Sequence, residues 1–571
     1  MPKKVAEIVV DALQKAGAKR VYGIPGDTIN HFTDAVAKSD LRWITVRHEE
    51  AGAFAAGAES YMTGELSICA GTCGPGSLHF VNGIYESHRN GAPVVLIASD
   101  VARTERGFNF PQEVDQKKIY EQHSHFCEYI SHPSQARRIV TKAAQAALTK
   151  KGVAVVIVNG DMFTESDDDE MDWAVYRPQP ISRPSDAEMA ELAALIDAAA
   201  KVTVYAGIGA RDARDEIIAF CEKVKAPMVH TTRAKEFLEP NNPYNVGVNG
   251  ILGNKAGVEA LEAADLVISL GCDFAYTQYY PDGKKIAQID IDPIHLGRRS
   301  AIHLGLVGDA KTTMSALLPM IAAKSDADHL ERQQKQWAED LQGYEKEGEE
   351  SDPALIHPQF VANMLNQKAA ENAIFVSDAG TSMVWMLRHV KANGKRRFLN
   401  TLLHGTMASG MPQAMGAKLA YPDRQVIAMC GDGSLTMLMG ELLTLVQEKI
   451  PLKLVVFHNN SFGFVEMEQR VEGLVDHYTS LHNPDFAKLA EACGLAGWHV
   501  ENADALEPAM DAWLQHDGPA LLDVKVNQME LVMPPKIEAS QVAGTALFGV
   551  KAVLDGRTRE VVDLLRNNFL R

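Results

Sequence analysis

The chain has 571 residues, too many for one hydrophobic core, and at about 100 to 200 residues per domain it predicts three or four domains. Its 46% hydrophobic and 23% charged residues are typical of a soluble globular protein, and no run reaches the roughly 18 apolar residues that a membrane span needs. A net charge of −18 without a long basic stripe argues against nucleic acid as a partner.

The N-terminal stretch MPKKVAEIVVDALQKAG predicts an amphipathic helix without a signal cleavage site, which favours a cytoplasmic location. Seven scattered cysteines do not predict a disulfide framework. Further along, short Val- and Ile-rich runs alternate with helical patterns, which indicates an α/β protein with parallel sheets covered on both faces. The runs are ICAGTCGPG, APVVLIASD, GVAVVIVNGD, KVTVYAGIG, DLVISLG, KIAQIDID, QVIAMCGDG, PLKLVVFHNN and PALLDVKVN.

Two segments have the composition of linkers. Residues 176 to 188 are rich in proline and polar residues, and residues 343 to 358 form a charged stretch that ends in prolines. These segments predict three units, 1–180, 186–340 and 356–530, followed by a tail, 531–571. The first and third units share a strand–helix rhythm, which suggests one fold used twice.

In the first unit, VRHEEAGAFAAGAESYMTG (46 to 64) predicts a closely packed helix that begins at His48 and Glu49, directly after a strand-like run. GTCGPGSLHFVNGIYES (71 to 87) predicts a glycine-rich turn, with Asn82 and Gly83 on the helix that follows. Taken alone, the first of these segments is explained by packing.

The central unit carries moderate signs of a dinucleotide. VTVYAGIGA predicts a strand followed by Gly207 and Gly209, and a lone motif of this kind is weak. IAQIDID places Asp290 near a strand end, where a carboxylate can bond an adenosine ribose. Without further information this unit is only Rossmann-like.

In the third unit, Asp432 stands between Gly431 and Gly433 where an apolar run gives way to a helical pattern. The carboxyl end of a parallel strand is a favoured phosphate site, because glycine allows close approach and the next helix offers free N–H groups. A carboxylate there would repel phosphate unless a cation lay between them, so Asp432 indicates Mg²⁺. A plain turn with Asp432 as helix cap is the alternative.

A second candidate ligand follows the next strand. Asn459 comes 27 positions after Asp432, at the end of PLKLVVFH, and would lie beside it if the two strands are neighbours. GDG, some 25 intervening residues and then Asn resembles the signature of the thiamine-diphosphate enzymes. The resemblance implies that Asp432, Asn459 and the Ser461 carbonyl hold Mg²⁺ against the cofactor diphosphate. Counting back four residues from Gly463 selects Asn459, and Asn460 is the alternative.

The resemblance extends to the other segments. It implies that Glu49, or less plausibly Glu50, bonds the pyrimidine ring of thiamine from a dry pocket, and that Met407 wedges the cofactor into a bent shape. Asp378 to Thr381 matches the loop on the diphosphate side. The cofactor-binding residues implied in the third unit are Gly405, Thr406, Met407, Asp432, Gly433, Ser434, Asn459, Asn460, Ser461, Phe462, Gly463 and Phe464.

Within this family the chain resembles the flavin-dependent pyruvate:quinone oxidoreductases, through CGPGSLHFVNG, YESHRNGAPV, CGDGSLTMLMGELL, FGFVEME and RNNFLR. This implies an FAD-binding central domain between a pyrimidine-binding and a diphosphate-binding domain, and a catalytic Phe464 linked to flavin reduction. A packing role is the alternative for Phe464. The residues implied to line FAD are Asn249, Gly250, Ile251, Leu252, Cys272, Asp273, Phe274, Ala275, Tyr276 and Asp290.

The tail ends in GRTREVVDLLRNNFLR, which predicts an amphipathic helix able to lie on an anionic membrane but not to span it. The predicted apolar side comprises Val561, Leu564, Leu565, Phe569 and Leu570, with Arg557, Arg559 and Arg566 near its polar edges. A terminal helix docked on the protein itself is the alternative.

The resemblance thus implies oxidative decarboxylation of pyruvate to acetate and carbon dioxide, with electrons passing through FAD to a membrane quinone. It also implies a homotetramer, peripheral on the inner face of the cell membrane through its C-terminal helix. The alternatives are an acetolactate synthase-like carboligase, a phosphate-dependent pyruvate oxidase that makes acetyl phosphate, and a catalytically silent nucleotide-binding scaffold.

Overall fold

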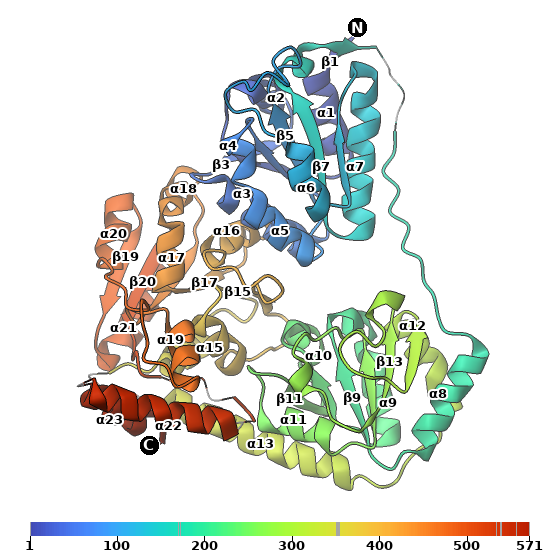
Figure 1. Ribbon diagram of the computed structural model, residues 1–571, viewed down its shortest axis with the longest axis vertical. Coiled ribbons are helices and arrows are strands. Elements are labelled where there is room, and N and C mark those ends of the chain that lie inside the picture. The colour runs from blue at the N-terminus through green and yellow to red at the C-terminus, as the bar shows by residue number, and fades with distance from the viewer. Residues whose placement is uncertain are drawn as a thin grey trace.

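Three six-stranded sheets, each surrounded by helices, make up most of the molecule (Figure 1). The computed structural model describes residues 2–168, 171, 173–349, 355–530, 532, 534–536, 539–555 and 557–569. Every pairing between neighbouring strands of the three sheets is parallel. The predicted α/β class with doubly wound parallel sheets is therefore confirmed.

The sheet of the first unit has the order β3-β2-β4-β5-β7-β6. Its strands β5 and β7 are buried at every residue, as their unbroken apolar sequences require. The strands are β2 (Arg20–Gly23), β3 (Arg42–Thr45), β4 (Ser67–Gly71), β5 (Val94–Asp100), β6 (Phe126–Tyr129) and β7 (Val153–Asn159). The helices are α1 (Val5–Lys15), α2 (Asn30–Ala37), α3 (Glu49–Thr63), α4 (Pro75–Leu78), α5 (Val81–Arg89), α6 (Gln116–Tyr120) and α7 (Ala136–Lys150). A short antiparallel pair, β1 (Lys3–Lys4) and β8 (Ser166–Asp167), lies beside them.

The sheet of the third unit repeats that topology, with the order β16-β15-β17-β18-β20-β19. When the strands of each unit are numbered from its own first strand, both sheets read 2-1-3-4-6-5, so one fold is used twice. The strands are β15 (Ile374–Ser377), β16 (Arg397–Leu399), β17 (Val426–Gly431), β18 (Lys453–His458), β19 (Ala496–Val500) and β20 (Ala520–Lys525). The helices are α14 (Pro358–Lys368), α15 (Thr381–His389), α16 (Gly410–Ala420), α17 (Asp432–Met437), α18 (Leu442–Gln447), α19 (Gly463–Val471), α20 (Phe486–Cys493) and α21 (Ala503–Gln515).

The central sheet differs, because its order β11-β10-β9-β12-β13-β14 reads 3-2-1-4-5-6, the order of dinucleotide-binding sheets. Its strands are β9 (Val202–Ala206), β10 (Met228–His230), β11 (Asn245–Val248), β12 (Leu266–Leu270), β13 (Lys285–Asp290) and β14 (Leu304–Val307). Its helices are α8 (Asp186–Ala198), α9 (Arg214–Val224), α10 (Lys235–Leu238), α11 (Lys255–Glu262), α12 (Ala310–Leu317) and α13 (Asp328–Glu349).

The two predicted linkers have different structures. Residues 173–185 contain no helix or strand and run from the first unit to the central one (Figure 1). The charged stretch from 343 to 358 instead begins inside α13, which continues to Glu349. Packing against α11 and α14 stabilises this helix, and the Tyr344 ring stacks edge-on at 5.9 Å from His389. The partners in α11 and at His389 lie far from Tyr344 in sequence, so the local composition did not indicate them.

Helices α3 and α16 join the first and third units through small residues. A Cβ atom on Gly416 would lie only 2.0 Å from the carbonyl oxygen of Ala55. On the other side of α3, a Cβ atom on Gly83 would lie 2.5 Å from that of Ala53. The prediction of a closely packed helix over 46–64 is confirmed, and this packing fixes the start of α3 relative to the third unit.

The tail forms two helices, α22 (Ala539–Leu554) and α23 (Thr558–Phe569), that pack on each other and on α19 (Figure 1). A Cβ atom on Gly544 would lie 1.8 Å from the carbonyl oxygen of Val471, so α22 approaches α19 at its backbone. Leu564 is buried against Phe548, whereas Leu565 remains exposed. The tail is thus docked on the protein. No described helix is long and apolar enough to cross a membrane. Leu570, Arg571 and the side chains of Arg559, Arg566 and Phe569 lie outside the described residues.

Candidate active site

Asp432 and Asn459 follow neighbouring strands, which is the condition under which they were expected to lie side by side. Strands β17 and β18 pair in parallel, with Gly431 opposite Phe457, so the two loops leave the same edge of the sheet. The Asp432 carboxylate accepts hydrogen bonds from the Asn460 backbone N–H at 2.6 Å and from the Asn483 side-chain amide at 2.9 Å. The two predicted ligand loops are therefore joined at Asp432.

The Asp432 carboxylate is buried, and the hydrogen bonds that reach it come from neutral donors. Besides Asn460 and Asn483, the Gly433 backbone N–H donates to it at 2.8 Å. Burial raises the pKa of Asp432, and the charges of His458 and Lys525 oppose that rise only in part. A buried carboxylate of this kind is stabilised by a bound cation, and oxygen ligands suit Mg²⁺.

The side chains of Asn459 and Asn460 lie differently. The Asn459 side-chain oxygen accepts from the Ser461 backbone N–H at 3.1 Å, which closes a tight turn. Asn460 has a left-handed backbone with φ 56° and lies with its side-chain oxygen 2.9 Å from His458 Nε2. The Ser461 hydroxyl donates to the buried Glu466. Asn459 as metal ligand, with Asn460 as its alternative, stays a prediction.

Glycines open space at the same edge of the sheet. Gly380 and Gly405 have φ of 131° and 69°, values that residues with a side chain rarely adopt. Apart from the chain neighbours, no atom of the described residues lies within 4 Å of a Cβ built on either, and the same is true of Gly431 at the end of β17. Next to it, burial raises the pKa of Asp378 to about 7. The open space and the free backbone fit a diphosphate held by a metal at Asp432.

The other predicted residues of the third unit lie around these loops. The Ser434 hydroxyl donates to the Ala379 carbonyl at 3.3 Å, and a Cβ atom on Gly433 would meet the Phe462 ring at 2.6 Å. Gly463 begins α19, and Phe464 is half-buried against the core of the unit. This position fits the packing alternative for Phe464 and leaves its catalytic role a prediction.

The segment with Met407 contacts the first unit. The Thr406 hydroxyl accepts from the Asn82 amide at 2.9 Å, and Met407 is half-buried beside it. Ala408 has φ 69°, a strained value for a residue other than glycine. Strain of this kind persists where surrounding contacts fix the backbone, and this strained residue directly follows Met407.

Glu49, at the start of α3, is buried, and its carboxylate lies 2.8 Å from Nδ1 of His79. A Cβ atom on Gly76 would lie 3.4 Å from the other carboxylate oxygen, so that side of Glu49 faces backbone without a side chain. Glu50 is half-buried and accepts from the Asn82 amide. Burial favours Glu49 over Glu50 for the predicted task in a dry pocket.

Two residues of this region were missed by the sequence analysis. His79 lies in the quoted segment GTCGPGSLHFVNGIYES, but its bond to Glu49 spans 30 positions. Glu441 is buried in the third unit and accepts from the backbone N–H groups of Arg47 and His48 at 2.9 and 2.8 Å. It thereby holds the loop before Glu49 from another unit. Its sequence neighbourhood carries no sign of this role.

The predicted flavin residues gather at a separate edge, that of the central sheet. A Cβ atom on Gly207 would lie 2.2 Å from the Gly271 carbonyl oxygen, so the loops after β9 and β12 meet at the point where strand order reverses. Asn249 is buried, and its side-chain oxygen has no hydrogen-bond partner among the described residues. Asp290, at the end of β13, lies 3.0 Å from His295 Nδ1.

The remaining predicted flavin residues line the same edge. A Cβ atom on Gly250 would strike the Phe274 ring at 2.4 Å, and Asp273 pairs with Arg298 and Arg299. Ile251 is half-buried, Leu252 and Cys272 are buried, and Ala275 and Tyr276 are exposed. Their sheet is not the one that carries Asp432, so the predicted residues form two groups.

Comparison with known proteins agrees with this arrangement. Residues 3–119, 189–317 and 378–524 match the N-terminal TPP binding domain, the central domain and the C-terminal TPP binding domain of thiamine pyrophosphate enzymes. The chain is 35% identical to the putative thiamine pyrophosphate-containing protein YdaP of Bacillus subtilis, over 99% of each chain. It is 29% identical to pyruvate oxidase of Lactiplantibacillus plantarum, over 91% of this chain and 88% of that one. It is 28% identical to the acetolactate synthase isozyme 2 large subunit of Escherichia coli, over 93% and 96%. The chain therefore belongs to the thiamine pyrophosphate enzyme family.

Proposed function

We propose that this protein oxidatively decarboxylates pyruvate to acetate and carbon dioxide and passes the electrons through FAD to a membrane quinone. The observation that carries the proposal is the junction at Asp432, where a buried carboxylate joins two loops beside open, glycine-lined space. Similarity to a pyruvate oxidase supports pyruvate as the substrate.

In the proposed site, Asp432, Asn459 and the Ser461 carbonyl hold Mg²⁺, and the backbone around Gly433 and Ser434 receives the diphosphate. When bound, thiamine diphosphate supplies the nucleophile and the electron sink for decarboxylation of a 2-keto acid. Carboxylate, amide and carbonyl oxygens are the ligands that Mg²⁺ prefers. The protein contributes the position of these groups and their burial.

Glu49 is proposed to exchange a proton with the pyrimidine ring of the cofactor. Its burial excludes water, and the contact with His79 at 2.8 Å orients the carboxylate. Because Gly76 has no side chain, a flat ring can approach the free side of Glu49. The first and third units carry the two halves of the site and contact each other within one chain. We propose that the protein is a homotetramer, as the family resemblance implies.

The central unit is proposed to bind FAD at the end of its sheet. The unpartnered oxygen of buried Asn249 and the strand-end carboxylate of Asp290 offer acceptors for a flavin and a ribose. The loops after β9 and β12 approach each other closely at Gly207 and Gly271, at the point where strand order reverses, and dinucleotides bind at such points in sheets of this order.

The tail supports the proposed transfer of electrons to a membrane quinone. Helices α19, α22 and α23 line a half-open apolar pocket of about 690 Å³, with side chains such as Val471, Val550 and Leu564. Helix α19, which lines one side of the pocket, begins at Gly463, after the loop that follows Asn459. An open apolar pocket in the tail suits peripheral contact with the inner face of a membrane.

The test uses the purified protein with Mg²⁺, thiamine diphosphate and pyruvate. Bleaching of the bound flavin together with formation of acetate is expected, and a soluble quinone analogue should restore the oxidised spectrum. Glu49→Gln serves as the matched inactive variant. Protein that contains no flavin, or a wild type no more active than Glu49→Gln, contradicts the proposal.

A second candidate is a carboligase, which similarity to acetolactate synthases favours. It predicts acetolactate as product while the flavin stays oxidised. A phosphate-dependent pyruvate oxidase would instead consume oxygen only when phosphate is present and would form acetyl phosphate. The same samples distinguish the three reactions by product analysis.

A further inference from the structure

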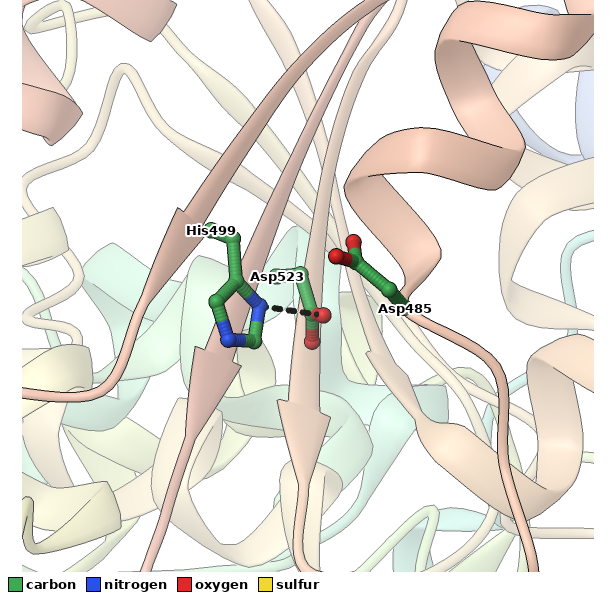
Figure 2. A group of neighbouring side chains, drawn as sticks. All are labelled: Asp485, His499 and Asp523. Carbon is green, nitrogen blue, oxygen red and sulfur yellow. Dashed lines mark hydrogen bonds and ion pairs between the residues drawn. The ribbon is translucent and has the colours of Figure 1, made fainter.

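A group of hydrogen-bonded side chains, buried at His458 and Asp523 and exposed at His499, lies behind the loop that follows β18. Strands β18, β20 and β19 are neighbours and carry His458, Asp523 and His499. Figure 2 shows His499 and Asp523 side by side, with Asp485, which precedes α20, next to them. Asp523 is fully buried. One of its oxygens lies 2.8 Å from Nδ1 of His458, and the other lies 2.8 Å from Nδ1 of His499.

A metal ion is one possible use of this group, because ligand atoms of Asp485, His499 and Asp523 lie within 4.8 Å of one another. However, the carboxylates of Asp485 and Asp523 both already accept hydrogen bonds. Asp485 accepts from the Lys488 backbone N–H at 3.0 Å and caps α20. Both oxygens of Asp523 are bonded to imidazoles. The contacts favour a support built from hydrogen bonds over a second metal site.

His458 connects Asp523 to the proposed magnesium loop. Its Nε2 lies 2.9 Å from the Asn460 side-chain oxygen and 2.7 Å from the Lys525 ammonium. The Phe486 ring stands edge-on to the imidazole at 4.9 Å and limits its rotation. Asn460 in turn donates its backbone N–H to Asp432. A continuous path of contacts therefore runs from Asp523 through His458 and Asn460 to Asp432.

This path explains how the strained turn is held. Asn460 has φ 56°, and surrounding contacts must hold a residue in that conformation. The hydrogen bond to buried Asp523 fixes the orientation of the His458 ring, so that its outer nitrogen meets the Asn460 side chain. Residues that hydrogen-bond a metal ligand orient that ligand, and their loss typically lowers metal affinity about 10- to 100-fold.

We propose that Asp523 and His458 are positioning residues that set the affinity of the loop from Asn459 to Ser461 for Mg²⁺ and thiamine diphosphate. The proposal rests on the proposed function of that loop. Neither residue is assigned contact with cofactor or substrate. They act through Asn460, so we expect them to govern cofactor affinity more than turnover once the cofactor is saturating.

The experiment measures binding rather than activity. Cofactor-free protein is titrated with thiamine diphosphate at fixed Mg²⁺, and with Mg²⁺ at fixed thiamine diphosphate, by calorimetry. Asp523→Asn and His458→Phe should each weaken binding about 10- to 100-fold, while kcat at saturating cofactor stays within about 3-fold. The variant with both substitutions should bind the cofactor about as tightly as whichever single variant binds it more weakly, because Asp523 and His458 act along one path and their effects should not add.

Two further variants separate positioning from folding. His458→Gln keeps an amide that can reach Asn460 and should recover most of the affinity lost in His458→Phe. Glu501→Gln is the control. Glu501 lies 3.0 Å from the outer nitrogen of His499 and, among the described residues, bonds neither His458 nor Asp523, so its replacement should change affinity less than 2-fold. Circular dichroism and urea unfolding check the fold, and if Asp523→Asn does not fold, the two His458 variants decide.

The outcomes distinguish this proposal from the one on which it rests. If the wild type binds Mg²⁺ and thiamine diphosphate but folded His458→Phe binds them equally well, the positioning role is wrong. Equal weakening by His458→Gln and His458→Phe also overturns it. If the wild type binds neither ligand, the proposed function of the loop fails first.

Discussion

The Asp432 carboxylate accepts a hydrogen bond from the Asn460 backbone N–H at 2.6 Å, so one acidic group ties together the loops after two neighbouring strands. Burial raises the pKa of Asp432, which means that its charge is costly in the folded protein unless a cation compensates it. The same group should therefore oppose stability without a cation and support binding with one.

Replacement of Asp432 by Asn should separate these two effects. We expect Mg²⁺-dependent binding of thiamine diphosphate to weaken more than about 100-fold. That loss exceeds the roughly 10- to 100-fold loss typical when a residue that only hydrogen-bonds a metal ligand is replaced. The free energy of unfolding of the cofactor-free protein at pH 8 should stay equal or rise. Calorimetry and urea unfolding measure the two quantities, with the exposed Asp504→Asn as control. Loss of stability in step with loss of binding would point to a structural role instead.

Removal of the Glu441 carboxylate should destabilise the contact between the first and third units. In Glu441→Ala, the backbone N–H groups of Arg47 and His48 lose their acceptor in a buried place, which should cost about 2 to 5 kcal/mol in the free energy of unfolding. Glu448→Ala is the matched control. Glu448 also bonds this segment, at Thr45 and Arg42, but from a partly exposed position, so it should cost less than about 1.5 kcal/mol. Equal losses in urea unfolding would contradict this account.

Replacement of His79 by Phe should slow turnover without loss of fold. The contact between His79 and the buried Glu49 carboxylate orients the proposed proton-transfer group, and a hydrogen bond to a charged group is worth about 1.5 to 3 kcal/mol. We therefore expect kcat for pyruvate decarboxylation to fall about 10- to 100-fold. His48→Phe is the control, because His48 stacks on His79 at 4.6 Å but does not bond Glu49. A fall of the same size in the control would assign the effect to packing.

Asp378 should make the stability of the cofactor-free protein depend on pH. Burial raises its pKa from 3.8 to about 7, so the folded state holds this proton more tightly than the unfolded state does. The stabilisation is fully present below about pH 4 and is lost as the pH rises to about 7, with an upper limit near 4 kcal/mol. The side chain of the Asp378→Asn variant cannot ionise. The unfolding free energy of the wild type should therefore fall relative to that of the variant as the pH rises from about 4 to about 7. Parallel curves from pH 4.5 to 8 would exclude the contribution.

The sequence was enough to predict that Asp432 and Asn459 each follow a strand, because the apolar runs before both residues were plain. Whether they share an edge depended on the two strands being neighbours, and the structure pairs those strands. The closely packed helix at Glu49 was predicted from its small residues in the same way. Roles that depend on partners distant in the chain were not predictable. Glu441 bonds residues almost 400 positions away, and nothing near it signals that contact.

The cluster of Asp523, His458 and His499 behind the proposed magnesium loop could not be predicted from the sequence, because it depends on the order of the strands. Asp523 lies next to His458 and His499 only because β20 inserts between β18 and β19, a crossover that alternating apolar runs do not specify. The length of α13 was missed for a related reason, since Tyr344 and its neighbours gain their partners from another helix. The residues assigned to FAD, by contrast, were gathered at one sheet edge, while their ligand stays a prediction.

The contact at Gly544 gives the tail an unusual sensitivity. Because α22 meets the Val471 carbonyl where Gly544 has only hydrogen, a single added methyl group would have to push the helix away from its seat. Alanine is a better helix former than glycine, so such a chain should keep α22 helical while the helix shifts. One carbon atom would thus weaken the seat of the last two helices without any change in charge, and would leave them held by contacts such as those of Lys551 with Gly473 and of Arg557 with Asp476.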